Sequence, residues 1–328
     1  MKPAKTAQNW IWRIAKPDVW MIALMSLITA LTSAGMVLFA VVTQYVIDIA
    51  TEEIVGNLWM AGGILVVMVI AEVMLNVWYQ YLSAWVAGRI VIRIKDSLFN
   101  TLFHKNWQDV SVFHTGELVN RLSSDNGVVA SGVTNLIPHI VSLFTRLIAC
   151  LIVLFSVDWR FTLVMLLVGS ILVFLSKFYG QKMKSIHKDC QATDGQGKSF
   201  AQESLANWMV IQSFSGVDTA CSRLRKLLVQ NYRAKLRRAK WRNVGSACSY
   251  LIFSGGYYVA LLWGAVMLSA DAITFGSLTA FLQVVSQIRT PLMNMTGILP
   301  QYYSMLASAE RIMELENLPD EPRLPQLY

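Results

Sequence analysis

The sequence has few charged residues and few prolines, and its cysteines show no paired spacing. Asp, Glu, Lys and Arg make up 15% of its 328 residues, whereas soluble domains carry roughly 25%. Its 8 prolines leave long stretches without a helix breaker. The 4 cysteines form no CxxC motif, which argues against a disulfide framework and against a zinc site. We therefore expect free thiols in a reducing compartment and no metal site.

Apolar residues are abundant instead, and they occur in long runs. They make up 55% of the chain, and the mean hydropathy is +0.47. A helix that spans the hydrocarbon layer of a membrane needs about 20 mostly apolar residues. Six runs are candidates, the last being the least apolar: Val19–Val42, Leu58–Leu75, Ile137–Phe155, Phe161–Phe178, Ala247–Leu268 and Thr274–Ile288. The sequence predicts an all-α membrane protein with six transmembrane helices.

The distribution of charge predicts the orientation of these helices. The net charge is +8, which by itself is also typical of proteins that bind nucleic acid. Basic residues are concentrated in the long links, however, and nearly absent from three short links, Thr51–Asn57, Ser156–Arg160 and Ser269–Ile273. Because basic loops stay on the cytoplasmic side, we expect a multi-pass protein of the plasma membrane with both termini in the cytoplasm. Nucleic acid is not an expected partner.

The N-terminal segment, residues 1–18, is basic and amphipathic. It lacks the apolar core and the small-residue cleavage site of a signal peptide. Such a composition is typical of a helix that lies on a membrane surface. We expect residues 1–18 to form an interfacial helix on the inner leaflet.

The links on the basic side are long and helical in pattern. No proline interrupts Leu58–Lys105, and apolar residues recur at helical spacing at Val86, Ile90, Ile94, Leu98 and Leu102. At 1.5 Å per residue this stretch reaches about 70 Å, more than twice the thickness of the hydrocarbon layer. Lys177–Arg242 contains no proline either, and it predicts a second projection that runs into the cytoplasm and returns. Projections of this length favour contact with a cytoplasmic partner.

Three segments carry a resemblance to a known family. The segment Phe113–Asp125 contains an aromatic residue, then a Gly-Glu pair, then an arginine and an aspartate at spaced positions. This pattern is similar to the first intracellular loop of ABC exporters. Gln202–Phe214 resembles their second intracellular loop. Phe275–Phe281, followed by Ser308–Ile312, is similar to their sixth helix and to the lead-in to the nucleotide-binding domain. In order and spacing, the chain resembles the transmembrane domain of an ABC exporter of half-transporter type, with the nucleotide-binding domain absent.

The resemblance implies a function and a set of partners. Such domains pair as domain-swapped dimers, homomeric or heteromeric, and move a substrate by alternating access. MgATP at nucleotide-binding domains that are absent from this sequence drives the cycle, so no cofactor is expected in this chain. The expected substrate is amphipathic: a peptide, a lipid-like molecule or a drug. The implied organisation is residues 1–18 as the interfacial helix, 19–315 as the six-helix domain, and 316–328 as a linker toward the missing domain.

The chain itself is not expected to be an enzyme, although the full-length protein would be an ATP-hydrolysing translocase. Ala192–Ser199 nearly reads as a phosphate-binding loop, but Ala192 replaces the first glycine and no buried strand precedes it. Phe253–Tyr257 imitates the cassette signature, yet it lies inside the fifth predicted span. We interpret both as coincidental.

The resemblance also implies which residues transmit force from the nucleotide-binding domains. The residues that match the two loops are Phe113, Gly116, Glu117, Arg121, Gln202, Glu203 and Asn207. Glycine at 116 permits a backbone turn, and Glu117, Arg121 and Asp125 share one face of a helix, where ion pairing is possible. The alternative is that this face is solvated. We expect short helices around Gln108–Glu117 and Ser199–Asn207, docking into the nucleotide-binding domains.

Polar residues within the spans are candidates for the translocation path. Thr279, Gln283, Ser286 and Gln287 form one polar stripe on the sixth span, which lines either a wet cavity or a contact with another helix. Glu72 and Arg146 lie at depths that differ by roughly one helical turn. They predict either an ion pair or a further part of the cavity.

Two other function classes remain open from the sequence. A six-span secondary carrier or channel is one, although it has little use for helices of about 70 Å. A peripheral helical protein that sequesters its apolar runs is the other, and six long spans argue against it.

Overall fold

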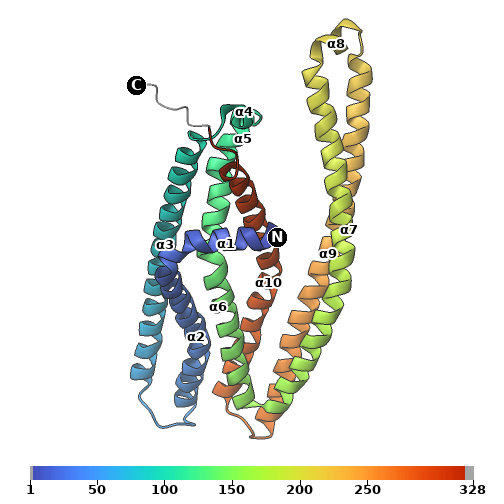
Figure 1. Cartoon of the computed structure of the whole chain (residues 1–328). Helices are drawn as coiled ribbons and strands as arrows, with labels where there is room; N and C mark the ends of the chain where they lie inside the picture. The colour runs from blue at the N-terminus through green and yellow to red at the C-terminus, as the bar shows by residue number, and fades with distance from the viewer. Residues whose placement is uncertain (1–2, 322–328) are drawn as a thin grey trace, which may run out of the picture. The chain divides into compact units, whose positions relative to one another are not determined.

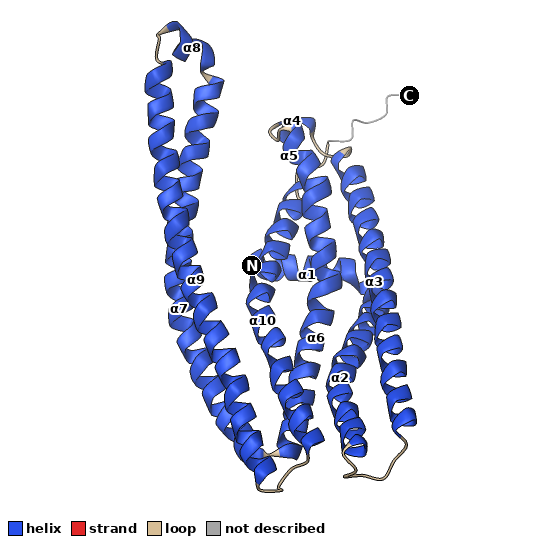
Figure 2. Cartoon of the chain, turned by 180° about the vertical axis from the view of Figure 1, so that it is seen from behind, coloured by secondary structure: helices blue, strands red, loops and turns tan. Residues whose placement is uncertain are grey.

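The computed structural model describes residues 3–321, without the side chains of residues 3–5, 165, 168–178, 292, 293 and 296. Helices connected by short links make up the described part of the chain, which contains no β-strand (Figure 2). The chain divides into two compact units, one of Met1–Val157 with Ala260–Tyr328, and one of Asp158–Val259. The predicted all-α fold is confirmed.

The first unit is a bundle of four long helices crossed by a short one (Figure 1). The long helices are α2 (Val19–Ala50), α3 (Leu58–Leu102), α6 (Asn126–Val157) and α10 (Phe275–Glu316), and the short one is α1 (Pro3–Ala15). Helix α2 packs against each of the other three long helices, and α6 packs against α10. The core lies where α3, α6 and α10 meet, at residues such as Ile90, Val129 and Ile312, all with 0% exposure.

Helix α3 extends as far as the sequence predicts. Its 45 residues correspond to about 68 Å of helix. Val86, Ile90, Ile94 and Leu98 are all buried, so the apolar repeat that continues past the predicted span faces the core. The projection is therefore a packed part of the bundle and not a free arm.

Helix α1 turns its apolar face toward the protein. Trp10 and Ile11 are buried, and the Trp10 indole Nε1 donates to the Glu316 carboxylate at 2.7 Å. The 3₁₀ turn that follows, Lys16–Asp18, buries Asp18, whose carboxylate lies 2.9 Å from an Arg93 guanidinium nitrogen. The N-terminal helix is thus fixed to α3 and to the end of α10.

A buried polar joint closes one end of the bundle, where α2 ends and α10 begins. The Gly276 N–H donates to the Asp48 carboxylate at 3.2 Å, and the Gln44 amide donates to Ser277 Oγ at 2.8 Å. Thr274 caps α10 by accepting from the Ser277 N–H at 3.0 Å. A Cβ at position 276 would overlap the Asp48 carboxylate and lie 2.6 Å from the Gln44 carbonyl oxygen. Only glycine fits this approach between the two helices.

The second unit is a long helical hairpin. Helices α7 (Trp159–Ala206) and α9 (Val217–Ser269) run side by side, with the short α8 (Trp208–Ser213) at the tip (Figures 1 and 2). A left-handed residue, Ser215 with φ 53°, turns the chain into α9. The prediction that Lys177–Arg242 projects and returns is confirmed.

Four helices of the described part are long and apolar enough to cross a membrane: Thr6–Ala50, Leu58–Leu102, Thr115–Val157 and Val217–Ser269. The predicted span Phe161–Phe178 lies within α7 and falls largely on residues whose side chains are outside the description. The span Thr274–Ile288 lies in α10, which carries the polar stripe. The six-span count therefore stays a prediction.

Both segments that imitate nucleotide motifs are helical. Ala192–Ser199 lies inside α7, where Lys198 pairs with Asp194 one turn earlier at 2.8 Å. Its amides are consequently used in the helix and cannot cradle a phosphate as a loop would. Phe253–Tyr257 lies inside α9.

Candidate coupling site

The first intracellular loop contains two short helices, α4 (Trp107–Ser111) and α5 (Thr115–Asn120). Asn106 caps α4 by accepting from the Gln108 N–H at 3.1 Å, as expected for an N-cap residue. The prediction of short helices around Gln108–Glu117 is confirmed. The argument for Gly116 is wrong, because Gly116 lies in α5 without a positive φ and has open space around it. The extended residue before α5 is His114, with ψ 141°.

At the tip of the hairpin, the prediction of a separate short helix at Ser199–Asn207 is wrong. Residues up to Ala206 continue α7, because no residue before Asn207 interrupts the helix. Asn207 ends it, with its side-chain amide donating to the Glu203 carbonyl at 3.0 Å. The short helix is the next segment, α8, and Gln202, Glu203 and Asn207 are exposed beside it.

A buried arginine connects the first loop to the end of α10. Arg121 is 4% exposed and pairs with Glu117 at 2.6 Å and with Glu314 at 2.8 Å. It also donates to the Arg311 carbonyl at 2.7 Å, and its guanidinium lies 4.7 Å from the centre of the Phe113 ring. The predicted pairing of Glu117 with Arg121 is confirmed, and the solvated-face alternative is wrong for Arg121.

Asp125 forms a second pair with α10. Its carboxylate, on a residue 3% exposed, accepts from Arg311 Nε at 2.8 Å and from Ser308 Oγ at 2.9 Å. The hydrogen bond from Arg311 is the main reason that the pKa of Asp125 lies below its ordinary value. Residues Arg121–Asp125 form a π-helical turn, whose wider spacing breaks the i, i+4 alignment expected of an α-helix. Asp125 therefore pairs with α10 and makes no ion pair with Arg121. We call Glu117, Arg121, Asp125, Ser308, Arg311 and Glu314 the ionic junction.

The segment after α10 is held to the same loop. Asn106 N–H donates to the Pro319 carbonyl at 3.0 Å, and Glu321 N–H donates to the His104 carbonyl at 2.9 Å. Between them, Lys105 Nζ lies 2.7 Å from the Asp320 carboxylate. The end of α10 and the residues that follow it are thus joined to the first intracellular loop by charged and backbone contacts.

Large apolar side chains are exposed at the tips of both projections. Trp107 and Val112 on the first are 74% and 78% exposed. On the second, Trp208, Met209 and Phe214 are 62%, 82% and 83% exposed. Polar residues surround them, and exposed apolar groups in such a setting make the two tips candidate surfaces for a partner.

The polar stripe of α10 separates into residues with different partners. Thr279 and Ser286 donate to carbonyls of their own helix, those of Phe275 and Gln283, at 3.0 and 2.7 Å. Gln287 instead donates to the Met36 carbonyl of α2 at 3.0 Å. No side-chain hydrogen bond of Gln283 occurs within the described part of the chain. The interhelical-contact alternative thus applies to Gln287, whereas Gln283 makes no such contact and its cavity role stays a prediction.

Glu72 and Arg146 are partly buried on α3 and α6. Of the two alternatives, the ion pair does not occur in this conformation of the described residues. The Arg146 Nε is buried and has no hydrogen-bond partner. A buried guanidinium nitrogen without a partner is unfavourable, and it leaves the cavity role as the remaining proposal.

The two glutamines permit a direct test. Gln287→Ala should lower the thermal unfolding midpoint, because it removes the bond to α2, which is worth about 1 kcal/mol. Gln283→Ala should leave that midpoint unchanged and alter substrate-stimulated transport in the full-length protein. Thermal unfolding in detergent and transport into vesicles would be measured for both. Equal losses of stability would contradict the cavity assignment of Gln283.

Comparison with known proteins gives the family. The model described as ABC transporter transmembrane region matches residues 21–292. ABC transporter B family member 1 of Dictyostelium discoideum is 26% identical over 92% of this chain and 33% of its own length. The ATP-dependent lipid A-core flippase of Vibrio vulnificus is 25% identical over 74% of this chain and 41% of its own. The chain spans less than half the length of these relatives.

The match covers both intracellular loops and most of the six predicted spans, and it decides against the carrier, channel and peripheral-protein alternatives. The order of the helices, the two projections with their short terminal helices and the family match agree with one another. This chain belongs to the ABC transporter transmembrane-region family.

Proposed function

We propose that this chain forms the membrane part of an ABC exporter, pairing with a second transmembrane subunit around an alternating-access path. ATP hydrolysis at nucleotide-binding domains outside this chain drives the cycle. Both termini and both projections face the cytoplasm, and the protein resides in the plasma membrane. Residues 1–18, 19–315 and 316–328 act as interfacial helix, translocation domain and linker. The exposed apolar tip of the hairpin carries the proposal, since it offers a docking surface at the end of a rigid pair of helices.

Two structural features support a path for force from the tips to the spans. The α7–α9 hairpin is continuous from its tip to its predicted spans, so displacement of α8 moves the whole hairpin. In the first unit, the ionic junction joins the first loop to α10, the helix that leads to the linker. Phe113, Glu117 and Arg121 belong to this connection, and Gln202, Glu203 and Asn207 flank the docking surface on α8.

The proposed substrate is a lipid-like amphipathic molecule. Several relatives are named as lipid A-core flippases, which favours a lipid over a peptide. An amphipathic substrate needs polar and apolar groups on one surface. Thr279, Gln283 and Ser286 on α10 supply the polar groups, with Glu72 and Arg146 as charged ones, among apolar neighbours.

The docking surface is tested by Met209→Ser with Phe214→Ser in the full-length protein. Both side chains are more than four-fifths exposed, so the midpoint of thermal unfolding should be unchanged. Loss of two apolar anchors from an interface typically costs 2 kcal/mol or more, so substrate-stimulated ATP hydrolysis should fall by roughly tenfold or more. The measurement is ATPase activity with and without substrate in proteoliposomes.

The matched control is Val55→Ser, which removes a fully exposed valine from the link between α2 and α3. It should leave coupling intact. Cysteines placed at Glu203 and on the nucleotide-binding domain should form a cross-link. Unaltered coupling in the double variant, together with no cross-link, would mean that force enters the membrane domain elsewhere.

A further inference from the structure

The hairpin carries a stretch of basic residues with one acidic residue, Asp189, at its edge. Helix α9 has no Asp or Glu between Asp218 and Asp271, and α7 has none between Arg160 and Asp189. Near the predicted cytoplasmic ends of the spans, both helices are basic. We call the following residues the basic belt: Lys182, Lys184 and Lys188 on α7, and Arg237, Arg238, Lys240 and Arg242 on α9.

The two helices are in contact where the belt begins. Tyr179 Oη donates to the Trp241 carbonyl at 3.0 Å, and a Cβ at Gly245 would overlap the Tyr179 ring. Since the helices are antiparallel, this contact brings Lys182 near the level of Arg242 and Lys184 near the level of Lys240. Like charges at one level of adjacent helices repel each other.

Farther toward the tip, the hairpin balances its charge internally. Asp194 of α7 pairs with Lys198 at 2.8 Å and with Lys235 of α9 at 3.2 Å, and accepts from the Asn231 amide at 2.6 Å. Hydrogen bonds from these three groups, Lys198 first, hold the pKa of Asp194 well below its usual range. In the described part of the structure, no residue of the belt takes part in an ion pair.

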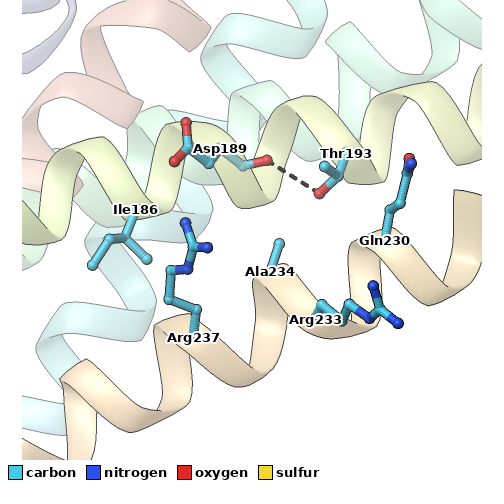
Figure 3. Close-up of a pocket in the computed structure, with 7 residues that line it drawn as sticks. All are labelled: Ile186, Asp189, Thr193, Gln230, Arg233, Ala234 and Arg237. Carbon is cyan, nitrogen blue, oxygen red and sulfur yellow. Dashed lines mark hydrogen bonds between the residues drawn. The ribbon is translucent and has the colours of Figure 1, made fainter.

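A hollow between the helices lies at the edge of the belt. It has a volume of about 230 Å³ and is lined by Ile186, Asp189 and Thr193 of α7 and by Gln230, Arg233, Ala234 and Arg237 of α9 (Figure 3). Arg237 extends from α9 toward α7 at one end of this hollow. Asp189 lines the same hollow as Arg233 and Arg237, and its carboxylate makes no ion pair in the part of the chain that the structure describes.

The position of the belt identifies the anion that fits it. Tyr and Trp concentrate at the headgroup level of a membrane, and Tyr179 and Trp241 meet at the start of the belt. Basic clusters directly cytoplasmic of a membrane span attract anionic lipids. We propose that the basic belt binds the phosphate headgroups of anionic lipids in the cytoplasmic leaflet. This lipid is a resident of the membrane around the hairpin and is separate from the transported substrate.

Titration of the intact protein in detergent tests the proposal, with bound lipids counted by native mass spectrometry. Phosphatidylglycerol should bind to the wild-type protein, whereas phosphatidylcholine should bind much more weakly. Lys240→Gln with Arg242→Gln should raise the apparent Kd for phosphatidylglycerol about 30-fold. Each basic residue near an anionic surface contributes about a fivefold step in affinity, and the two steps multiply. Raised salt should weaken wild-type binding, as expected for an electrostatic site.

The matched control is Arg225→Gln with Lys226→Gln, which removes the same charge from α9 roughly 24 Å closer to the tip. Both residues are exposed, and binding should be retained. The charge-preserving variant Lys240→Arg with Arg242→Lys should also bind. If the α9 variant Lys240→Gln with Arg242→Gln fails to fold, Lys182→Gln with Lys184→Gln tests the same site from α7. This second variant should also weaken the binding of phosphatidylglycerol.

Three outcomes would overturn the proposal. Equal weakening in the control would show a response to net charge alone. Unchanged binding of phosphatidylglycerol in both belt variants, the one at Lys240 and Arg242 and the one at Lys182 and Lys184, would place the lipid elsewhere. Competition by inorganic phosphate at concentrations matching those of the lipid would show that the belt holds a free anion and not a lipid headgroup.

Discussion

Replacement of Arg311 by methionine should lower the free energy of unfolding of the membrane domain by about 3 kcal/mol, the lower end of the range for breaking a buried ion pair. The variant strands the Asp125 carboxylate, whose side chain is 4% exposed, while the Arg311 side chain is 47% exposed. Because solvent already screens the exposed Arg311 guanidinium, we expect the loss of unfolding free energy at the lower end of that range. Denaturant unfolding in detergent measures it, and coupled ATP hydrolysis should fall as well, because the ionic junction joins the first loop to α10.

The effect should depend on pH in a defined direction. Arg311 holds the pKa of Asp125 below its ordinary value. The ionised carboxylate therefore stabilises the folded wild-type protein at neutral pH, and this contribution is lost as the pH falls toward the folded-state pKa. The difference between wild type and variant should shrink below about pH 4, the ordinary pKa of aspartate. A difference that stays constant into acid would contradict the role of the carboxylate.

Two variants control for this result. Arg13→Met removes another α10 partner, but the Arg13 side chain is 75% exposed and lies 4.0 Å from Glu316, so the loss should stay below about 1 kcal/mol. Asp125→Asn with Arg311→Met removes both charges and should recover much of the stability. If Arg311→Met loses no more than Arg13→Met, the junction is not a structural element.

Gly276→Ala should destabilise the protein by about 2–3 kcal/mol, as expected for overpacking at a rigid contact. The added Cβ would overlap the Asp48 carboxylate and lie 2.6 Å from the Gln44 carbonyl oxygen, a backbone atom that cannot rotate away. Moving the helices apart would also lengthen the bond from the Gly276 N–H to Asp48. Thermal unfolding in detergent, scored against wild type, measures the loss.

Gly63→Ala is the matched control for this substitution. Gly63 also lies near the start of a long helix, and a Cβ there meets nothing within 4 Å. Because alanine is a better helix residue than glycine, this variant should be as stable as the wild type or more so. Similar losses at both positions would show that glycine matters for flexibility and not for the approach of α2 to α10.

The sequence predicts the helices of this protein well because their signals are local. The apolar repeat through Val86, Ile90 and Ile94 follows the period of an α-helix, and each of these residues is buried where the repeat places it. The pairing of Glu117 with Arg121 is equally local, being one helical turn apart. The short helices of the first loop also follow from nearby residues, with Asn106 as a cap.

The contacts between distant segments could not be predicted in the same way. Asp125 meets Arg311, and Gly276 meets Asp48, across more than 180 residues, and nothing in the local pattern pairs them. The π-helical turn at Arg121–Asp125 also shifts Asp125 off the face that a regular α-helix predicts. Whether Glu72 pairs with Arg146 could not be predicted either, since depth along two helices does not determine how each is rotated.

The division of the first unit along the chain has a consequence for synthesis. Its last helix, α10, is separated from α6 by the entire hairpin, residues 158–259. A chain is made from its N-terminus, so α2, α3 and α6 are complete before α10 has been made. The Asp48 and Asp125 carboxylates then lack their partners Gly276 and Arg311, which lie 228 and 186 residues later in the chain. Contacts across such long separations form slowly. The contacts that join α10 to α2 and α6 can therefore form only after the whole hairpin has been made.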